Sequence, residues 1–463
     1  SERGNIELDK KYDLTEGNVL KTIVYFMLPI LAGNVFQQLY STVDTIIVGR
    51  TLGADALAAV GGTGSIQFMV FGFSSGLASG VTVLTSQYIG AKDREKASRS
   101  VAMIYMVDIG ITIICTVGGI LLLPVLLNIL HMPSELYGRA YTYQFICFAG
   151  LAGKLLYNLE ASLLRAIGDS RTPLIFLILA SMMNIILDLI FIIDLHMDVS
   201  GAALATIFSE SFSGAACLLY SLKKYEMLRV RKKDFRIEFC FLKDHIKTGV
   251  PISIQNSITG IGVMVFQSAL NGMGTNSIAA YTACHKIETF ATMPMFAIGT
   301  ALVTYVAQNF GAKKNQRIKQ GVNAALFSCL VFSIAIGAGI IIFCRPLVSV
   351  FVGNKALEVI RLSQIYVAVE GSCLWCAALL FVYRAAVQGV GVTKIPMWGG
   401  FLELFMRIFA AVYLSRLLGF RGLAAAYPLA WLAAAVLNIT YYAFLCRNGF
   451  ERNTSHHVTK GEL

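Results

Sequence analysis

The stretch Tyr88-Ile-Gly-Ala-Lys92 recurs 221 positions later as Asn309-Phe-Gly-Ala-Lys313. Other short motifs recur at the same offset, within two positions. They are Gly53-Ala-Asp-Ala-Leu-Ala-Ala59 with Gly274-Thr-Asn-Ser-Ile-Ala-Ala280, Gly168-Asp-Ser-Arg-Thr-Pro173 with Gly391-Val-Thr-Lys-Ile-Pro396, Gly201-Ala-Ala-Leu-Ala205 with Gly422-Leu-Ala-Ala-Ala426, and Pro29 with Pro251. An offset of nearly half of the 463 residues indicates two copies of one folding unit.

The composition places both copies in a membrane. Hydrophobic residues make up 56% of the chain and charged residues only 14%, whereas soluble proteins have roughly 25% charged residues. Because one span takes about 20 apolar residues, this length holds about twelve. We predict an all-α integral membrane protein with spans near residues 19–49, 56–88, 100–129, 136–164, 173–193, 200–222, 249–270, 277–309, 320–344, 357–383, 395–415 and 422–446.

The basic residues predict the orientation of these spans. Of the 38 Lys and Arg residues, 28 fall in segments that share one side of the membrane and five in segments on the other side. Positive charge favours the cytoplasmic side, so both termini are expected in the cytoplasm of a cell whose inner or plasma membrane holds the chain. The net charge of +11 therefore indicates topology and contact with lipid, and does not indicate nucleic-acid binding.

The repeat also predicts the domain organisation. Six spans per copy is an even number, so both copies enter the membrane in the same sense, as parallel repeats of alternating-access carriers do. We expect an N-lobe over 1–222, a basic cytoplasmic linker over 223–248, a C-lobe over 249–447 and a cytoplasmic tail over 448–463.

Polar side chains inside the spans mark the candidate site, because an ionisable group there is costly and is usually functional. Asp44 lies in the first span, Asn184 and Asp188 lie one helical turn apart in the fifth, and Thr206 lies in the sixth. Their oxygens suit Na+ as ligands, and the two carboxylates suit proton binding.

Several motifs together resemble the multidrug and toxic compound extrusion (MATE) family. They are Pro29 followed by Val43-Asp-Thr-Ile-Ile-Val-Gly49, Gln87-Tyr-Ile-Gly-Ala-Lys92, Leu164-Arg-Ala-Ile-Gly-Asp-Ser-Arg-Thr-Pro173 and Gln308-Asn-Phe-Gly-Ala-Lys313. The resemblance implies two six-helix lobes related by pseudo-two-fold symmetry in a V shape. It also implies efflux of amphipathic, often cationic, small molecules in exchange for Na+ or H+.

The resemblance further implies that Asp44, Asn184, Asp188 and Thr206 form the cation-coupling site, with Gln37 and Tyr143 as possible members of a surrounding polar network. One branch of the family has an acid in the seventh span and another in the tenth, where this chain has Thr259 and, by our alignment, Leu379. We therefore place the coupling site in the N-lobe. Glu403 and Arg407 are expected to form a structural ion pair, because they lie one helical turn apart.

Flexible thioethers and aromatic faces suit the binding of amphipathic cations. We expect the substrate cleft to be lined by Met27, Phe36, Tyr40, Met69, Met264 and Met293. Pro29 and Pro251 each remove a backbone hydrogen bond and are expected to permit helix bends.

Other functions remain as alternatives. A flippase for a lipid-linked precursor would favour a cationic cleft, for which Lys154, Lys286 and Arg407 give weak support. Enzyme chemistry is not expected, because the spans contain only the isolated His285 and no HExxH motif. We expect a monomer without a cofactor other than its coupling ion.

Overall fold

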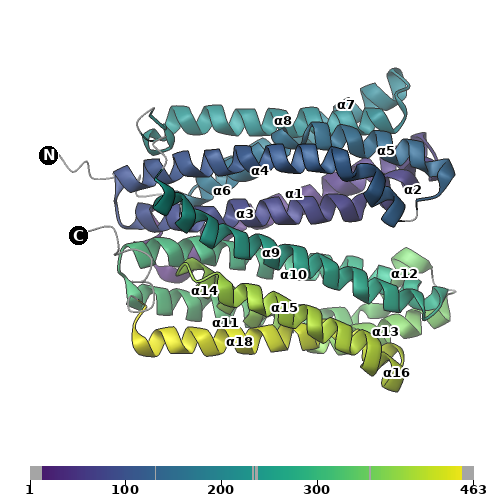
Figure 1. Ribbon diagram of the computed structural model, residues 1–463. Coiled ribbons are helices and arrows are strands. Elements are labelled where there is room, and N and C mark those ends of the chain that lie inside the picture. The colour runs from purple at the N-terminus through teal and green to yellow at the C-terminus, as the bar shows by residue number, and fades with distance from the viewer. Residues whose placement is uncertain (1–12, 131, 232–233, 235–237, 354–355, 451–463) are drawn as a thin grey trace. The chain divides into compact units, whose positions relative to one another are not determined.

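The computed structural model describes residues 13–130, 132–231, 234, 238–353 and 356–450. In these residues every regular element is a helix (Figure 1). The first half contains α1 (Val19–Thr51), α2 (Ala54–Gly62), α3 (Gly64–Gly90), α4 (Arg94–Ile129), α5 (Ser134–Ala149), α6 (Leu151–Ala166), α7 (Arg171–Asp188), the π-helix η1 (Leu189–Asp194), α8 (Asp198–Lys224) and the 3₁₀ turn η2 (Glu226–Leu228). The second half contains α9 (Phe239–Asn271), α10 (Thr275–Gly311), α11 (Asn315–Ile342), α12 (Cys344–Val352), α13 (Leu357–Ser372), α14 (Leu374–Gly389), α15 (Lys394–Phe409), the π-helix η4 (Ala410–Leu414), α16 (Ser415–Leu418), α17 (Phe420–Ala424) and α18 (Ala426–Asn448).

These helices form the expected twelve spans. Nine helices of the described chain are long and apolar enough to cross a membrane, and the bent pair α13–α14 makes a tenth. The other two are α5–α6, which breaks at Gly150, and α15 with η4 and α16. Each of these spans consists of helical pieces of 16 residues or fewer, because the first breaks at Gly150 and the second changes to a π-helix at Ala410. The prediction of an all-α fold with twelve spans is confirmed.

The backbone repeats itself at the predicted offset. Lys92 and Lys313 are both left-handed, with φ of 58° and 57°, and each follows a long helix. Gly168 and Gly391 share a φ of 94°. The π-helices η1 and η4 also fall at equivalent places, each following a span that begins with a repeated Pro-containing motif. The sequence repeat is therefore a structural repeat, down to single backbone angles.

The described chain divides into two compact units. Unit 1 contains Pro29–Gly249 with Asp13, and unit 2 contains Leu14–Leu28 and the chain from Val250 onward. Within unit 1, α6 and α7 each pack against α8, and α3 against α4. Within unit 2, α18 packs against α14 and α15.

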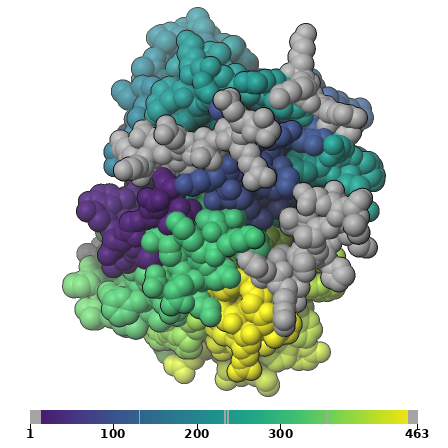
Figure 2. Space-filling view, turned by 90° about the vertical axis from the view of Figure 1, so that its left-hand side faces the viewer, coloured from purple at the N-terminus to yellow at the C-terminus, as the bar shows by residue number. Residues whose placement is uncertain are grey.

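The segment before Pro29, which we assigned to the N-lobe, thus belongs to unit 2. Leu14 donates its backbone N–H to Gln308 Oε1 at 3.2 Å, and Lys314 Nζ donates to the carbonyl oxygen of Thr15 at 2.9 Å. Figure 2 shows the start of the chain, in purple, against the green surface that includes this α10–α11 turn. The helix α1 therefore passes from one unit to the other at Pro29.

The start of α9 likewise belongs to the other unit than the rest of the helix. The residues expected to form the last part of the linker are helical from Phe239 and group with unit 1 up to Gly249. The buried His245 joins Ser100 through Nε2 and Oγ at 2.6 Å. The chain changes unit within α9 next to Pro251. Residues 451–463 of the expected tail lie outside the described residues.

Candidate functional site

Two carboxylic acids from separate spans of unit 1 lie together. Asp44 comes from α1 and Asp188 is the last residue of α7, where the helix changes to the π-helix η1. Their side chains are adjacent, and Asp188 is fully buried. Asp44 Oδ1 is buried and accepts no hydrogen bond. Two adjacent buried carboxylates repel each other unless a proton or a cation lies between them.

The remaining predicted members of the site surround this pair. Asn184 Nδ2 lies 3.5 Å from Thr206 Oγ1, which joins α7 to α8. The hydroxyl of Tyr40 also meets Thr206 and lies near both acids. The structure thus brings Asp44, Asn184, Asp188 and Thr206 together. Their carboxylate, amide and hydroxyl oxygens are the hard ligands that Na+ accepts, and the orphaned oxygen of Asp44 leaves a position for a cation.

Tyr143 and Gln37 are the two residues expected in a surrounding polar network. Tyr143 is 6% exposed, and its hydroxyl meets Gln67 while its ring lies near Asp44 and Tyr40. Gln37 lies on α1 with Tyr40 and Asp44, at intervals of three and four residues. This spacing places all three on one face of the helix.

A pocket of about 40 Å³ opens beside the acids, which is room for a few water molecules. Gln37, Tyr40 and Asn184 line it, together with an ion pair in which Lys154 Nζ lies 3.0 Å from Glu210 Oε1. Glu210 was not among the residues predicted from the sequence. The available signal was its position one helical turn after Thr206, which puts it on the same face of α8.

Close packing of α6 on α8 fixes the position of this ion pair. A Cβ atom on Gly153 would lie 2.6 Å from the Cα of Ser211, and one on Gly214 would lie 2.8 Å from the carbonyl oxygen of Gly153. Only glycine permits these approaches, as is typical of membrane helices that meet through small residues. Lys154 follows Gly153 in the sequence and Glu210 precedes Ser211, so this helix contact holds the two charged residues close together.

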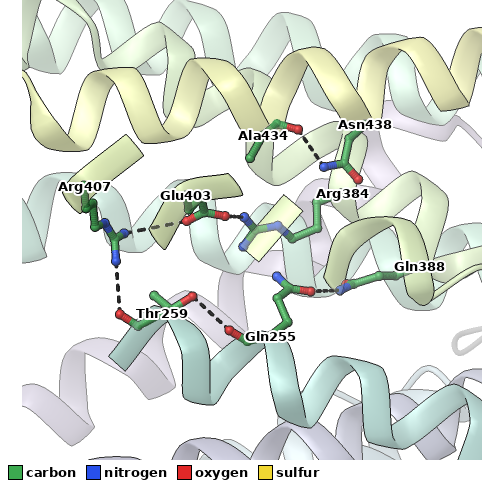
Figure 3. Close-up of polar contacts among 8 residues, drawn as sticks. All are labelled: Gln255, Thr259, Arg384, Gln388, Glu403, Arg407, Ala434 and Asn438. Atoms are coloured by element: carbon green, nitrogen blue, oxygen red, sulfur yellow. Dashed lines mark hydrogen bonds and ion pairs between the residues drawn. The ribbon is translucent and has the colours of Figure 1, made fainter. Parts of the chain in front are cut away.

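Unit 2 contains a different polar network (Figure 3). The expected pair is present, with Arg407 Nη2 3.6 Å from Glu403 Oε2. Glu403 makes a shorter ion pair with Arg384 of α14, which the sequence analysis did not include. Arg407 also donates to the carbonyl oxygen of Thr259 at 3.0 Å, and Gln388 donates to Gln255 at 3.1 Å. The network ties α9, α14 and α15 together.

Unit 2 also contains a buried acid that was not predicted as part of a site. Glu370 of α13 is 5% exposed and adjacent to Glu288 of α10. Tyr366 lies beside this second pair, and His285 Nδ1 lies 3.1 Å from Glu288 Oε2. Leu379, the residue expected at the position of the family's acid, lies in α14, after the break of this span at Cys373.

The residues predicted to line the substrate cleft are distributed over both units. Of these residues only Tyr40 lines the pocket of unit 1. Met27 is buried in the part of α1 that belongs to unit 2, whereas Phe36, Met69 and Met264 are exposed. Met293 is half-buried on α10. Pro29 and Pro251 lie inside continuous helices.

Twelve spans in two repeated units, with adjacent buried acids and an internal polar pocket, define a multi-pass membrane transporter built from parallel repeats. The chain belongs to the MATE family of multidrug efflux transporters. The sequence model of the MatE family matches residues 29–190 and again residues 251–414.

Named relatives agree with this assignment. The probable multidrug resistance protein YpnP of Bacillus subtilis is 31% identical, over 67% of this chain and 69% of its own. The probable multidrug resistance protein NorM of Thermotoga maritima is 28% identical, over 84% and 83%. A MATE crystal structure in a bent conformation shares the fold with a TM-score of 0.89 at 22% identity, covering 97% of this chain and 100% of that one.

Proposed function

We propose that this protein exports small amphipathic, often cationic, compounds in exchange for Na+ or H+ by alternating access. We place it in the cell membrane with both termini in the cytoplasm. The observation that carries the proposal is the adjacent pair Asp44 and Asp188 with Asn184 and Thr206 around it. Because the two carboxylates repel each other, the site is stable only with a bound cation or proton. Binding and release of that cation or proton are therefore coupled to the conformation of the protein.

The helix α1 connects this site to the pocket. Gln37 and Tyr40 line the pocket, and Asp44 lies one turn further along the same face. An ion at the acids draws α1 towards α7 by removing the repulsion between Asp44 and Asp188. Its loss lets α1 move away, and Pro29 lowers the cost of bending because it leaves one backbone hydrogen bond unmade. Ion binding and compound binding thereby favour different positions of α1.

Two of the three cations that support the flippase alternative are paired with acids, and the third, Lys286, is exposed. Lys154 pairs with Glu210, and Arg407 pairs with Glu403. Lys154 and Arg407 are therefore largely compensated within the protein, which weakens the flippase alternative.

Dye tolerance in an efflux-deficient bacterium tests the proposal. Cells that express the wild-type chain should tolerate several-fold more ethidium than cells with an empty vector, and Asp44→Asn should abolish the difference. Asp55→Asn is the matched control, because Asp55 is an exposed acid in the first turn of α2. The proposal is wrong if the wild type gives no tolerance, or if Asp44→Asn keeps it at equal expression.

A further inference from the structure

The ion pair between Lys154 and Glu210 differs from the structural ion pair in unit 2. The side chains of Lys154 and Glu210 are 26% and 23% exposed, whereas those of Glu403 and Arg407 are 3% exposed each. Both partners of the first pair line the pocket. A molecule in the pocket can therefore reach the charges of Lys154 and Glu210, whereas the buried pair of Glu403 and Arg407 is not accessible.

A second observation points to an occupant of the pocket. Ser213 Oγ lines the same pocket, is buried, and has no hydrogen-bond partner. Leaving a buried hydroxyl unsatisfied costs free energy. The ring of Phe71, also in the lining, lies 5.0 Å from Lys154 Nζ and supplies an aromatic face next to the charges.

The charges of the lining restrict which ligand can bind. Lys154 and Glu210 are the charged residues among the described lining, and their net charge is zero. A ligand with one charge would pair with one of them and leave the other uncompensated in a low-dielectric site, which is strongly unfavourable. A ligand with both an anionic and a cationic group replaces both partners at once. The Lys154–Glu210 pair thus favours ligands with both charges, because a ligand with a single charge leaves one of the two residues without a counter-charge.

We propose that this pocket recognises a zwitterionic end of the exported compound, with Lys154 binding its carboxylate and Glu210 binding its ammonium group. Ser213 donates to the same end, and the remainder of the compound extends out through the opening of the pocket. The proposal rests on the proposed function, in that the compound bound here is the one exported. It adds to the proposed substrate class a preference, in that compounds with both charges bind more tightly than compounds with a cationic group alone.

Binding to the purified protein in detergent tests this proposal. The probes are the fluorescent α-amino acid Nε-dansyl-lysine, whose carboxylate and ammonium groups share one end of the molecule, and, at pH 6, its methyl ester, which keeps only the cation. The wild type should bind the zwitterion about tenfold more tightly than the ester, which is about 1.4 kcal/mol. Lys154→Met and Glu210→Gln should each remove this preference, and the exchanged pair K154E/E210K should restore most of it. Ser213→Ala, which keeps both charges, should weaken zwitterion binding a fewfold.

Equal affinity of the wild type for the two probes would overturn the proposal. An equal loss of affinity for both probes in Lys154→Met and Glu210→Gln would also overturn the proposal, since an ion pair with a merely structural role predicts that result. If a single variant does not fold, the comparison of probes in the wild type and in Ser213→Ala still decides. Binding needs no ion gradient, so failure of this selectivity and failure of coupled export are distinguishable.

Discussion

At the scale of single residues, the interior of this protein depends on charges that compensate one another. Glu403 lies between Arg384 and Arg407 and is 3% exposed. Replacement by Gln would leave two close guanidinium groups without a counter-charge. Removing one partner of a buried ion pair typically costs about 3–5 kcal/mol. We therefore expect Glu403→Gln to lower the thermal unfolding midpoint in detergent substantially.

Glu358→Gln provides the control for this prediction. Glu358 pairs with Arg361 at 3.8 Å, but the two side chains are 54% and 74% exposed. Exposed pairs contribute about 0–1 kcal/mol, so the midpoint should hardly change. Similar midpoints for the two variants would show that the network of unit 2 does not stabilise the protein.

The sequence was sufficient to predict that Asp44 and Asp188 matter, because acids are rare inside apolar spans, and helical spacing related Asn184 to Asp188. The structure brings these residues and Thr206 together, and their role in ion coupling stays a prediction. The sequence was not sufficient for Glu210, Arg384 or Glu370. Arg384 lies at the predicted edge of a span, where a basic residue reads as a topology signal. Glu370 precedes a helix break, and only the folded span shows which side of the break faces Glu288.

At the scale of helices, small residues set the distance between α6 and α8. Gly153→Ala would put a methyl group 2.2 Å from Ser211 Oγ and 2.6 Å from its Cα. Because the second contact is with backbone, the helices must separate. Overpacking of this kind costs about 1–3 kcal/mol. We expect a lower unfolding midpoint and weaker binding at the pocket between Lys154 and Glu210.

Gly118→Ala is the matched substitution in α4, where nothing lies within 4 Å of the added carbon. Alanine is favoured over glycine in a helix by about 0.5–1 kcal/mol, so this variant should be as stable as the wild type or more stable. A higher thermal unfolding midpoint for Gly153→Ala than for Gly118→Ala would contradict the packing described for α6 and α8.

At the scale of the whole molecule, one scaffold occurs twice with different chemistry. The sequence repeat predicted the structural repeat because backbone features such as the left-handed Lys92 and Lys313 follow local sequence. It did not predict that α1 and α9 begin in the opposite unit, since that exchange depends on tertiary contacts such as those of Leu14. The acids also differ, with Asp44 and Asp188 in unit 1 and Glu288 and Glu370 in unit 2.

Two pairs of acids raise the question of which one couples ion movement to export. We assign this role to unit 1, because Asp44 lies on the helix that also lines the pocket. Glu370→Gln should therefore retain coupling, whereas Asp44→Asn and Asp188→Asn should lose it.

Dye efflux from proteoliposomes, with a Na+ gradient and a pH gradient imposed separately, tests this assignment most directly. We expect one of the two gradients to drive efflux by the wild type and by Glu370→Gln. Neither gradient should drive it for Asp44→Asn or Asp188→Asn, although dye binding should remain. Gradient-driven efflux by Asp44→Asn at the wild-type rate would contradict the account.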